Sequence, residues 1–229
     1  MKKIQLAVFD MAGTTVNEGN VVYKTVRAAL GKQGVDVSLE TVLEFGAGKE
    51  KFKAIADILE KTKNTSIDAN LVFEGFKKML EEAYANLEVT TYDGVEELFK
   101  ILKSNEVKVV LNTGYDRKTA ISLLNKLGWV PGEQIDALIT ADDVVRGRPS
   151  SEMIDKAMEM FEINSPENVL KAGDSVIDIE EGKNANCGWT VGVLTGAQTR
   201  EQLATAEPSI ILESLADLAE QLFPGQIKK

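Results

Sequence analysis

The sequence predicts an α/β protein in which a parallel sheet is covered by helices and a helical block is inserted after the first strand. Three observations support this prediction. Short apolar, β-branched runs alternate with amphipathic helical patterns through the second part of the chain. From about residue 20 to residue 86 the pattern is helical only. Polar side chains suited to phosphate chemistry follow four of the apolar runs, as expected where parallel strands end.

The predicted strands are brief apolar segments separated by helical segments. Residues 4–9 form the first strand, which delivers the carboxylate of Asp10 at its end. Further strands are predicted at 107–111, 137–140, 169–172, 190–194 and 209–211. Helices are predicted between them at 94–104, 117–127, 151–161 and 177–185.

The region between the first two strands carries apolar residues at helical spacing. Helices are predicted at 21–30, from Ser38 onward, at 52–59 and at 71–87. A helical block of this length is expected to form a separate cap over the catalytic edge of the sheet. We therefore predict a core domain of residues 1–16 and 90–229 and a cap domain of residues 17–89.

Composition excludes several functions. The 229 residues carry a net charge of -10, with a pI near 4.7, which argues against binding to nucleic acid or to an anionic membrane surface. The single cysteine, Cys187, excludes an intrachain disulfide. No leader peptide and no apolar run of membrane-spanning length is recognised, so a cytoplasmic location is expected. The sequence contains no histidine, which removes Ser-His-Asp and Cys-His catalysis and histidine-containing zinc sites.

The first candidate motif is Asp10 followed by Met11, Ala12 and the turn Gly13-Thr14-Thr15. One strand-end carboxylate before small residues whose amides face an anion suits covalent attack on phosphorus beside a cation. Thr14 is accordingly a candidate phosphate contact. Taken alone, an aspartate before a glycine is more often a turn former or a helix cap.

Three later strand ends carry further candidates. Thr113 and Gly114 can donate a hydroxyl and an amide to an anion near a helix start. Arg148 offers a cation beside a phosphorylated aspartate. Asp174 and Asp178 are spaced to face one side of a first helical turn, which suits Mg²⁺. Each has an ordinary alternative when taken alone: a helix-start turn, a surface arginine, or a helix cap.

Together, Asp10, Thr113, Arg148 and the Asp174/Asp178 pair resemble the four ordered motifs of the haloacid dehalogenase-like superfamily. The resemblance covers essentially the whole chain and implies a Rossmann-like core. It also implies that the inserted helices form a C1-type cap. A monomer or homodimer that binds a small phosphorylated or phosphonate substrate is the expected form.

The segments 10–16, 143–149 and 173–185 are similar to the phosphonatase branch of that superfamily. The resemblance implies that Mg²⁺ is bound by the Asp10 carboxylate, the Ala12 carbonyl and Asp174, with Asp178 holding a bound water or the second shell. In that branch a cap lysine forms an imine with the aldehyde substrate, and a histidine follows it closely. This chain has no histidine, and alignment on residues 53–55 places Gly48 at the lysine position.

Three cap lysines follow that glycine. We expect Lys51 and Lys53 to lie on a solvated helix face, whereas Lys49 is the candidate contact to a substrate phosphate or carboxylate. Glu180 and Glu181 are likewise expected on a solvated helix face.

Ala12 stands where the phosphatases of this superfamily place the aspartate that protonates the leaving group. Three possibilities therefore remain open. The chain is a phosphonatase-like hydrolase whose substrate has a good leaving group or whose acid comes from the cap. It is a true phosphonatase with a displaced lysine. Or it is a weakly active or non-catalytic phosphate-binding protein with a regulatory role. The first is favoured, as a Mg²⁺-dependent phosphohydrolase that forms an aspartyl-phosphate.

Overall fold

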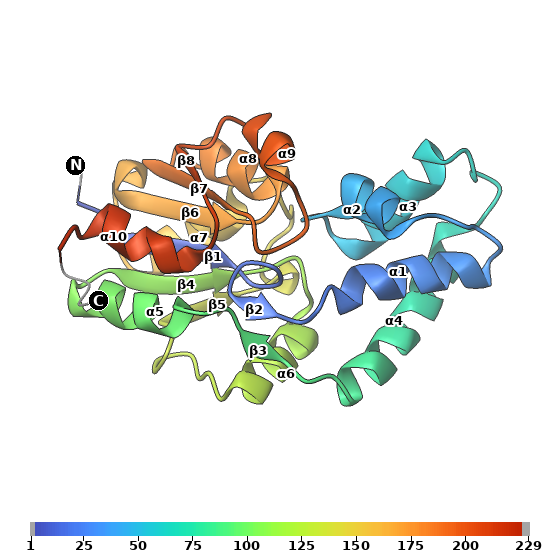
Figure 1. Ribbon diagram of the computed structural model, residues 1–229, viewed down its shortest axis with the longest axis horizontal. Coiled ribbons are helices and arrows are strands. Elements are labelled where there is room, and N and C mark those ends of the chain that lie inside the picture. Colours follow the sequence, from blue (N-terminus) through green and yellow to red (C-terminus); the bar gives the residue numbers. More distant parts are fainter. Residues whose placement is uncertain (1–2, 226–229) are drawn as a thin grey trace.

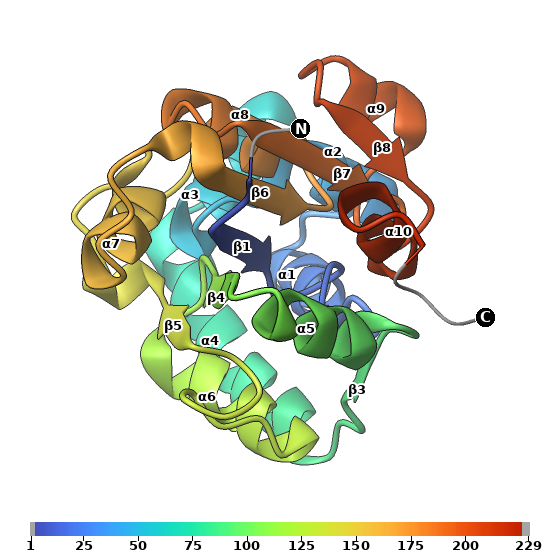
Figure 2. The ribbon, with the colours of Figure 1, turned by 90° about the vertical axis from the view of Figure 1, so that its left-hand side faces the viewer.

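The computed structural model describes residues 3–225. Within them, a six-stranded sheet has the order β5-β4-β1-β6-β7-β8, and all neighbouring pairs are parallel (Figure 2). The strands are β1 (Leu6–Asp10), β4 (Lys108–Asn112), β5 (Ala137–Ile139), β6 (Val169–Gly173), β7 (Trp189–Val193) and β8 (Ile210–Leu212). All six predicted strands are confirmed, each within about two residues of the predicted ends.

Helices cover both faces of the sheet, as expected for parallel strands buried on both sides. They are α5 (Val95–Ser104), α6 (Arg117–Leu127), α7 (Glu152–Met160), α8 (Val176–Asn184), α9 (Arg200–Ala204) and α10 (Leu218–Leu222). Successive residues of β1 point to opposite faces. Phe9 packs against Phe99 of α5 with ring centroids 5.6 Å apart, whereas Leu6 and Val8 belong to the cluster that contains α7 residues. The sheet therefore lies between two apolar layers.

Four helices lie to one side of the sheet, beyond the ends of its strands (Figure 1). They are α1 (Val21–Lys32), α2 (Leu39–Gly46), α3 (Lys51–Lys61) and α4 (Ala69–Ala85). Their buried residues recur at helical spacing, and α1 packs against α4 while α2 packs against α3. Ser38 caps α2 by accepting a hydrogen bond from the Thr41 amide, as its position in the sequence predicts.

The chain enters and leaves these four helices through a two-stranded antiparallel ribbon that the sequence did not reveal. Strands β2 (Val16–Asn17) and β3 (Thr90–Thr91) pair side by side. The Thr91 hydroxyl also donates to the Thr15 carbonyl at 2.8 Å. The ribbon lies close to the predicted domain boundaries at 16/17 and 89/90, and the division into core and cap remains a prediction.

Candidate active site

Asp10 occupies the carboxyl end of the central strand β1. Strands β4 and β6 flank it, and the pairing register places Asp10 opposite Asn112. Asp10 is only 6% exposed. Because the neighbouring strands end at the same edge, the polar residues that follow them converge on this carboxylate.

Three carboxylates meet at this edge. Oxygen atoms of Asp10, Asp174 and Asp178 all lie within 4.8 Å of one another, and all three residues are buried. The Ala197 amide donates to Asp174 Oδ2 at 2.5 Å, and the Ser175 hydroxyl donates to Asp178 Oδ2 at 2.5 Å. Asp174 does not cap α8, because that position belongs to Ser175. The structure thus brings together the acidic residues that the sequence proposes as metal ligands.

Arg148 is the buried cation of the site. Its Nη1 donates to Asp10 Oδ1 at 2.6 Å and lies 2.9 Å from Asp178 Oδ1. Its Nη2 donates to the carbonyl oxygen of Asn112 at 2.7 Å and to the side-chain oxygen of Asn112 at 3.0 Å. Arg148 is therefore not the solvent-exposed loop arginine of the alternative interpretation.

Burial and charge shift the pKa values of these groups in different directions. Burial, followed by the charges of Asp10 and Asp178, raises the pKa of Asp174 well above its usual range. Burial also raises the pKa of Asp10, against the opposing charge of Arg148. For Asp178, burial acts in the same upward direction, but the cations of Arg148 and Lys171 outweigh it and lower the pKa. The cluster is thus short of positive charge around Asp174.

The donor set fits a divalent cation. Two buried cations, Arg148 and Lys171, face four buried carboxylates, those of Asp10, Asp174, Asp178 and Glu181, so the group carries a formal charge of −2. Carboxylate oxygens are the ligands that Mg²⁺ prefers. Asp10, Ala12 and Asp174 all line one small pocket of about 20 Å³, room for about one water molecule. These residues, with Asp178, would hold the ion.

The predicted phosphate-binding groups fall into two sets. Thr113 and Gly114 line the same pocket as Asp10 and Arg148. The Thr113 hydroxyl accepts a hydrogen bond from the Tyr115 amide at 3.2 Å. Thr14 is fully buried, does not line the pocket, and its hydroxyl has no hydrogen-bond partner among the described residues. Its proposed contact with phosphate therefore gains no support from this geometry.

The three lysines at positions 49, 51 and 53 have different surroundings. Lys49 does not line the pocket, and its ammonium pairs with Asp57 at 2.5 Å. Lys53 is exposed, as predicted. The expectation of a solvated face was wrong for Lys51, which lines the pocket together with Asp10 and Arg148.

The surroundings of Lys51 explain the lowered pKa of its amine. Its Nζ donates to the Lys49 carbonyl at 2.7 Å and lies 5.1 Å from the centre of the Tyr23 ring. Burial, only partly opposed by the charge of Asp10, lowers the pKa of the Lys51 amine to about 8. A signal for this position existed in the sequence: Lys51 precedes Ile55 by four residues and Ile58 by seven, which places it on the buried face of α3.

A second correction concerns α8. Glu180 is exposed as expected, but Glu181 is fully buried. Its carboxylate accepts two hydrogen bonds from the Asn112 amide, at 2.8 and 3.0 Å, and its Oε2 lies 3.1 Å from the Nζ of Lys171. A helix turn faces the sheet as well as the solvent, and here Glu181 lies on the inner side. Lys171, inside an apolar strand, was the sequence signal that a buried anion must exist nearby.

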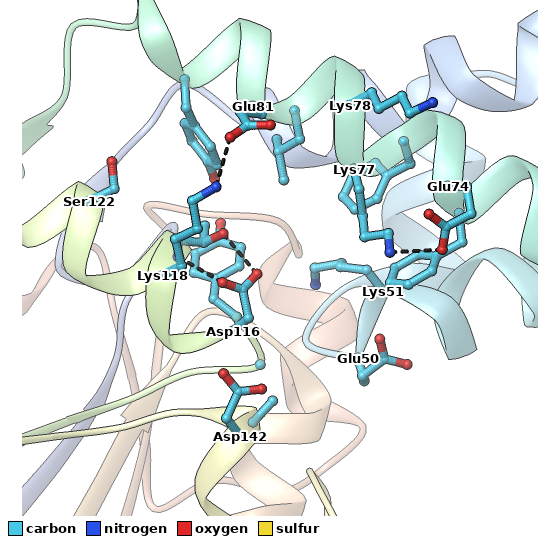
Figure 3. A pocket seen from close by; sticks show the side chains of 18 of the residues that line it. Glu50, Lys51, Glu74, Lys77, Lys78, Glu81, Asp116, Lys118, Ser122 and Asp142 are labelled. Carbon is cyan, nitrogen blue, oxygen red and sulfur yellow. Dashed lines mark hydrogen bonds and ion pairs between the residues drawn. The ribbon is translucent and has the colours of Figure 1, made fainter.

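A larger cavity of about 950 Å³ adjoins the small pocket and shares Lys51, Gly114 and Tyr115 with it. It lies between α4 and the start of α6 (Figure 3). Figure 3 shows the Lys51 side chain extending into this space, and Lys118 reaching across it to Glu81. Asp116 lines the cavity but also caps α6, accepting from the Thr119 amide at 2.8 Å. The pocket around Asp10 thus borders a cavity large enough for a small molecule.

A buried polar site at the carboxyl ends of parallel strands is typical of α/β enzymes. Residues 4–186 match the family model described as haloacid dehalogenase-like hydrolase, and the chain belongs to this family. A phosphonoacetaldehyde hydrolase from Parabacteroides distasonis is 28% identical over 95% of both chains. Another from Bacillus mycoides is 30% identical over 93% of this chain and 86% of its own. These relatives confirm the resemblance to the phosphonatase branch.

Solved structures show the same fold. A phosphonoacetaldehyde hydrolase-like protein from Oleispira antarctica has a TM-score of 0.81 at 24% identity, covering 98% of this chain and 96% of its own. A hydrolase from Pseudomonas syringae also has a TM-score of 0.81, at 19% identity over 95% of this chain and 97% of its own. The protein, a hydrolase by its family, therefore has the Rossmann-like fold. No helix within residues 3–225 is both long enough and apolar enough to cross a membrane.

Proposed function

We propose that the protein is a Mg²⁺-dependent hydrolase that attacks phosphorus with Asp10 and forms an aspartyl-phosphate. One observation carries this proposal: Asp10 lies at a strand end within 4.8 Å of two further carboxylates while Arg148 donates to it at 2.6 Å. A carboxylate placed between a cation site and a guanidinium is suited to accept a phosphoryl group. The substrate is a small phosphorylated or phosphonate metabolite, and the expected cytoplasmic location suits it.

Each group near Asp10 has a distinct task in this proposal. Bound Mg²⁺ would screen the negative charges of the approaching nucleophile and phosphoryl group. Arg148 and the Gly114 amide hold the oxygens of the transferring group, and Thr113 adds a hydroxyl. Residues 17–89 act as a cap that excludes bulk water. Ala12 has no acidic side chain with which to protonate the leaving group. The substrate therefore needs a good leaving group, or the cap must supply the acid.

Replacement of the nucleophile tests the proposal. Asp10→Asn keeps the size of the side chain and replaces the carboxylate by a neutral amide, which is a poor nucleophile. We expect hydrolysis of the best substrate from a panel of phosphate esters and phosphonates, assayed with Mg²⁺, to fall by on the order of 10⁴-fold or more. Asp155→Asn, which alters an exposed carboxylate of α7 outside both pockets, is the matched control and should leave hydrolysis unchanged. Hydrolysis that survives Asp10→Asn would exclude the aspartyl-phosphate.

The position of Lys51 favours a second candidate, cleavage of the carbon–phosphorus bond of phosphonoacetaldehyde. The Lys51 amine would condense with the aldehyde and release water. The resulting iminium would accept the electron pair of the carbon–phosphorus bond as the phosphoryl group passes to Asp10. The enamine is then protonated and hydrolysed to acetaldehyde. An amine with a pKa near 8 is much more often neutral at physiological pH than an ordinary lysine.

Borohydride reduction separates the two candidates. With phosphonoacetaldehyde present, an imine at Lys51 gives a stable secondary amine that peptide mass spectrometry locates. Lys51→Arg should abolish the adduct, whereas Lys49→Arg, two residues away and paired with Asp57, should retain it. Absence of any adduct in the unmodified protein would remove the imine route and leave the Asp10 proposal intact.

A further inference from the structure

A buried polar network lies behind Arg148, on the side away from the pocket. Lys171 of β6 is fully buried, and its Nζ faces three oxygens: Asn112 Oδ1 at 2.7 Å, Asp178 Oδ1 at 3.0 Å and Glu181 Oε2 at 3.1 Å. The contact with Asn112 is a hydrogen bond, whereas the contacts with Asp178 and Glu181 are ion pairs. A lysine enclosed in this way costs free energy unless it is paired.

Asn112 connects the two buried cations. Its side-chain oxygen accepts from both Lys171 and Arg148, and its amide donates to both oxygens of Glu181. With its main-chain carbonyl, Asn112 also binds Nη2 of Arg148 at 2.7 Å. The guanidinium therefore has one nitrogen fixed by Asn112, while Nη1 faces Asp10.

Arg148 stands between two sets of carboxylates that compete for it. On the pocket side lies Asp10. On the inner side lie Asp178, 2.9 Å from Nη1, and Glu181, 3.3 Å from Nε. Lys171 faces both inner carboxylates. Without its charge, Asp178 and Glu181 would have Arg148 as their principal cation and would draw it inward.

The helix that carries the two inner carboxylates packs directly on Lys171. A Cβ on Gly182 would lie 2.9 Å from the Cβ of Lys171 and 2.7 Å from Thr190 Cγ2, closer than real side-chain contacts. Only glycine permits this approach of α8 to β6. The distance between Lys171 and Glu181 is thereby fixed by the backbone packing.

We propose that Lys171 is a positioning residue: its charge offsets those of Asp178 and Glu181, and through Asn112 it keeps Arg148 directed toward Asp10, where the guanidinium would bind the phosphoryl group. This inference rests on the proposed function, because it concerns the arginine that holds the phosphoryl oxygens. Lys171 itself does not line the pocket. Its effect passes through Arg148.

Binding of inorganic phosphate in the presence of Mg²⁺, measured by titration calorimetry, tests the inference. Lys171→Met should weaken phosphate binding roughly 10- to 100-fold, the usual cost of losing a group that orients a binding residue. The double variant Lys171→Met/Glu181→Gln removes one competing carboxylate as well and should regain most of the affinity. Lys183→Met, which removes an exposed lysine from α8, is the matched control and should bind phosphate as the unmodified protein does.

A double-mutant cycle distinguishes positioning from general support of the fold. In an Arg148→Met background, Lys171→Met should cause little further loss of phosphate affinity, because the residue through which it acts is gone. If Lys171→Met lowers phosphate affinity equally in the unmodified and Arg148→Met proteins, the inference is overturned. It is also overturned if Lys171→Met binds phosphate as tightly as Lys183→Met. If Lys171→Met does not fold, Lys171→Gln carries the same prediction, since it keeps a donor toward Asn112 and lacks the charge.

The two proposals fail differently. Unmodified protein that neither binds phosphate nor depends on Asp10 for hydrolysis would overturn the proposed function and this inference together. Asp10-dependent hydrolysis with an unaffected Lys171→Met variant would overturn the inference alone.

Discussion

Arg148 donates to Asp10 at 2.6 Å although 138 residues separate the two in the chain. This contact orients the carboxylate of Asp10, and its positive charge opposes the upward shift that burial imposes on the pKa of Asp10. The ionised form of Asp10, the form that the proposed attack on phosphorus requires, therefore depends on a residue from the loop before α7.

Arg148→Lys tests this dependence. A lysine keeps the charge but cannot reach Asp10 and Asn112 with two separate nitrogens. We expect kcat/KM to fall by roughly 10²- to 10³-fold, as for loss of one donor to a transition-state oxygen. Steady-state kinetics with saturating Mg²⁺ measures the change. Arg146→Lys, which alters an exposed arginine two residues earlier, should leave kcat/KM unchanged.

Mg²⁺ should stabilise the folded protein. Binding to the buried carboxylates relieves their mutual repulsion, and a ligand at 100 times its Kd adds about 2.7 kcal/mol to the free energy of unfolding. We expect Mg²⁺ to raise the Tm of protein treated with a chelator. Asp174→Asn should abolish the rise, whereas Glu180→Gln, at an exposed position on α8, should retain it. An undiminished rise in Asp174→Asn would place the ion elsewhere.

The buried charge of Lys51 should lower the free energy of unfolding at neutral pH. Its pKa is about 8 in the folded state and 10.5 in the unfolded state, so between these values the unfolded state binds more protons and stability rises with pH. Below pH 8 the cost of burying the charge is fully present. Lys51→Met should therefore raise Tm at pH 7, and the gain should shrink as pH rises toward 10.5. A constant gain from pH 7 to 10 would contradict this.

Gly13 should be needed both for its backbone conformation and for the space beside Asp174. Its φ is +85°, and a Cβ there would overlap the Asp174 carboxylate. Gly13→Ala should cost about 1–2 kcal/mol from backbone strain and should also remove the Tm response to Mg²⁺. Gly19→Ala is the control: its φ is +63°, but nothing lies within 4 Å of the added carbon, so the Mg²⁺ response should persist. Denaturant unfolding with and without Mg²⁺ measures both effects.

Sequence patterns predicted the elements whose signal is local. The helix Arg117–Leu127 has the predicted bounds, because Asp116 caps its start and Gly128 ends it in a left-handed conformation. The ribbon of β2 and β3 was not predicted, since strands of two residues are too short to show a period. Its pairing joins residues more than seventy positions apart.

The sequence predicted those residues of the candidate site that come after the predicted strands. Asp10 and Asp174 do so, Arg148 lies further along the loop after β5, and the structure brings all three together. Lys51 and Glu181 do not, because each lies on a helix with a polar and a buried side, and one charged residue does not reveal which side it occupies. Lysines are frequent here, so Lys49 and Lys51 were distinguishable only through the apolar residues four and seven positions further on.

The β2–β3 ribbon has a mechanical consequence. Both connections between the sheet and the helices α1–α4 run through these two strands, which are hydrogen-bonded to each other. The helices are thus joined to the sheet at one place, by two paired strands, rather than by two separate connecting segments. Because the two strands are hydrogen-bonded to each other, neither connection can shift relative to the sheet without carrying the other with it.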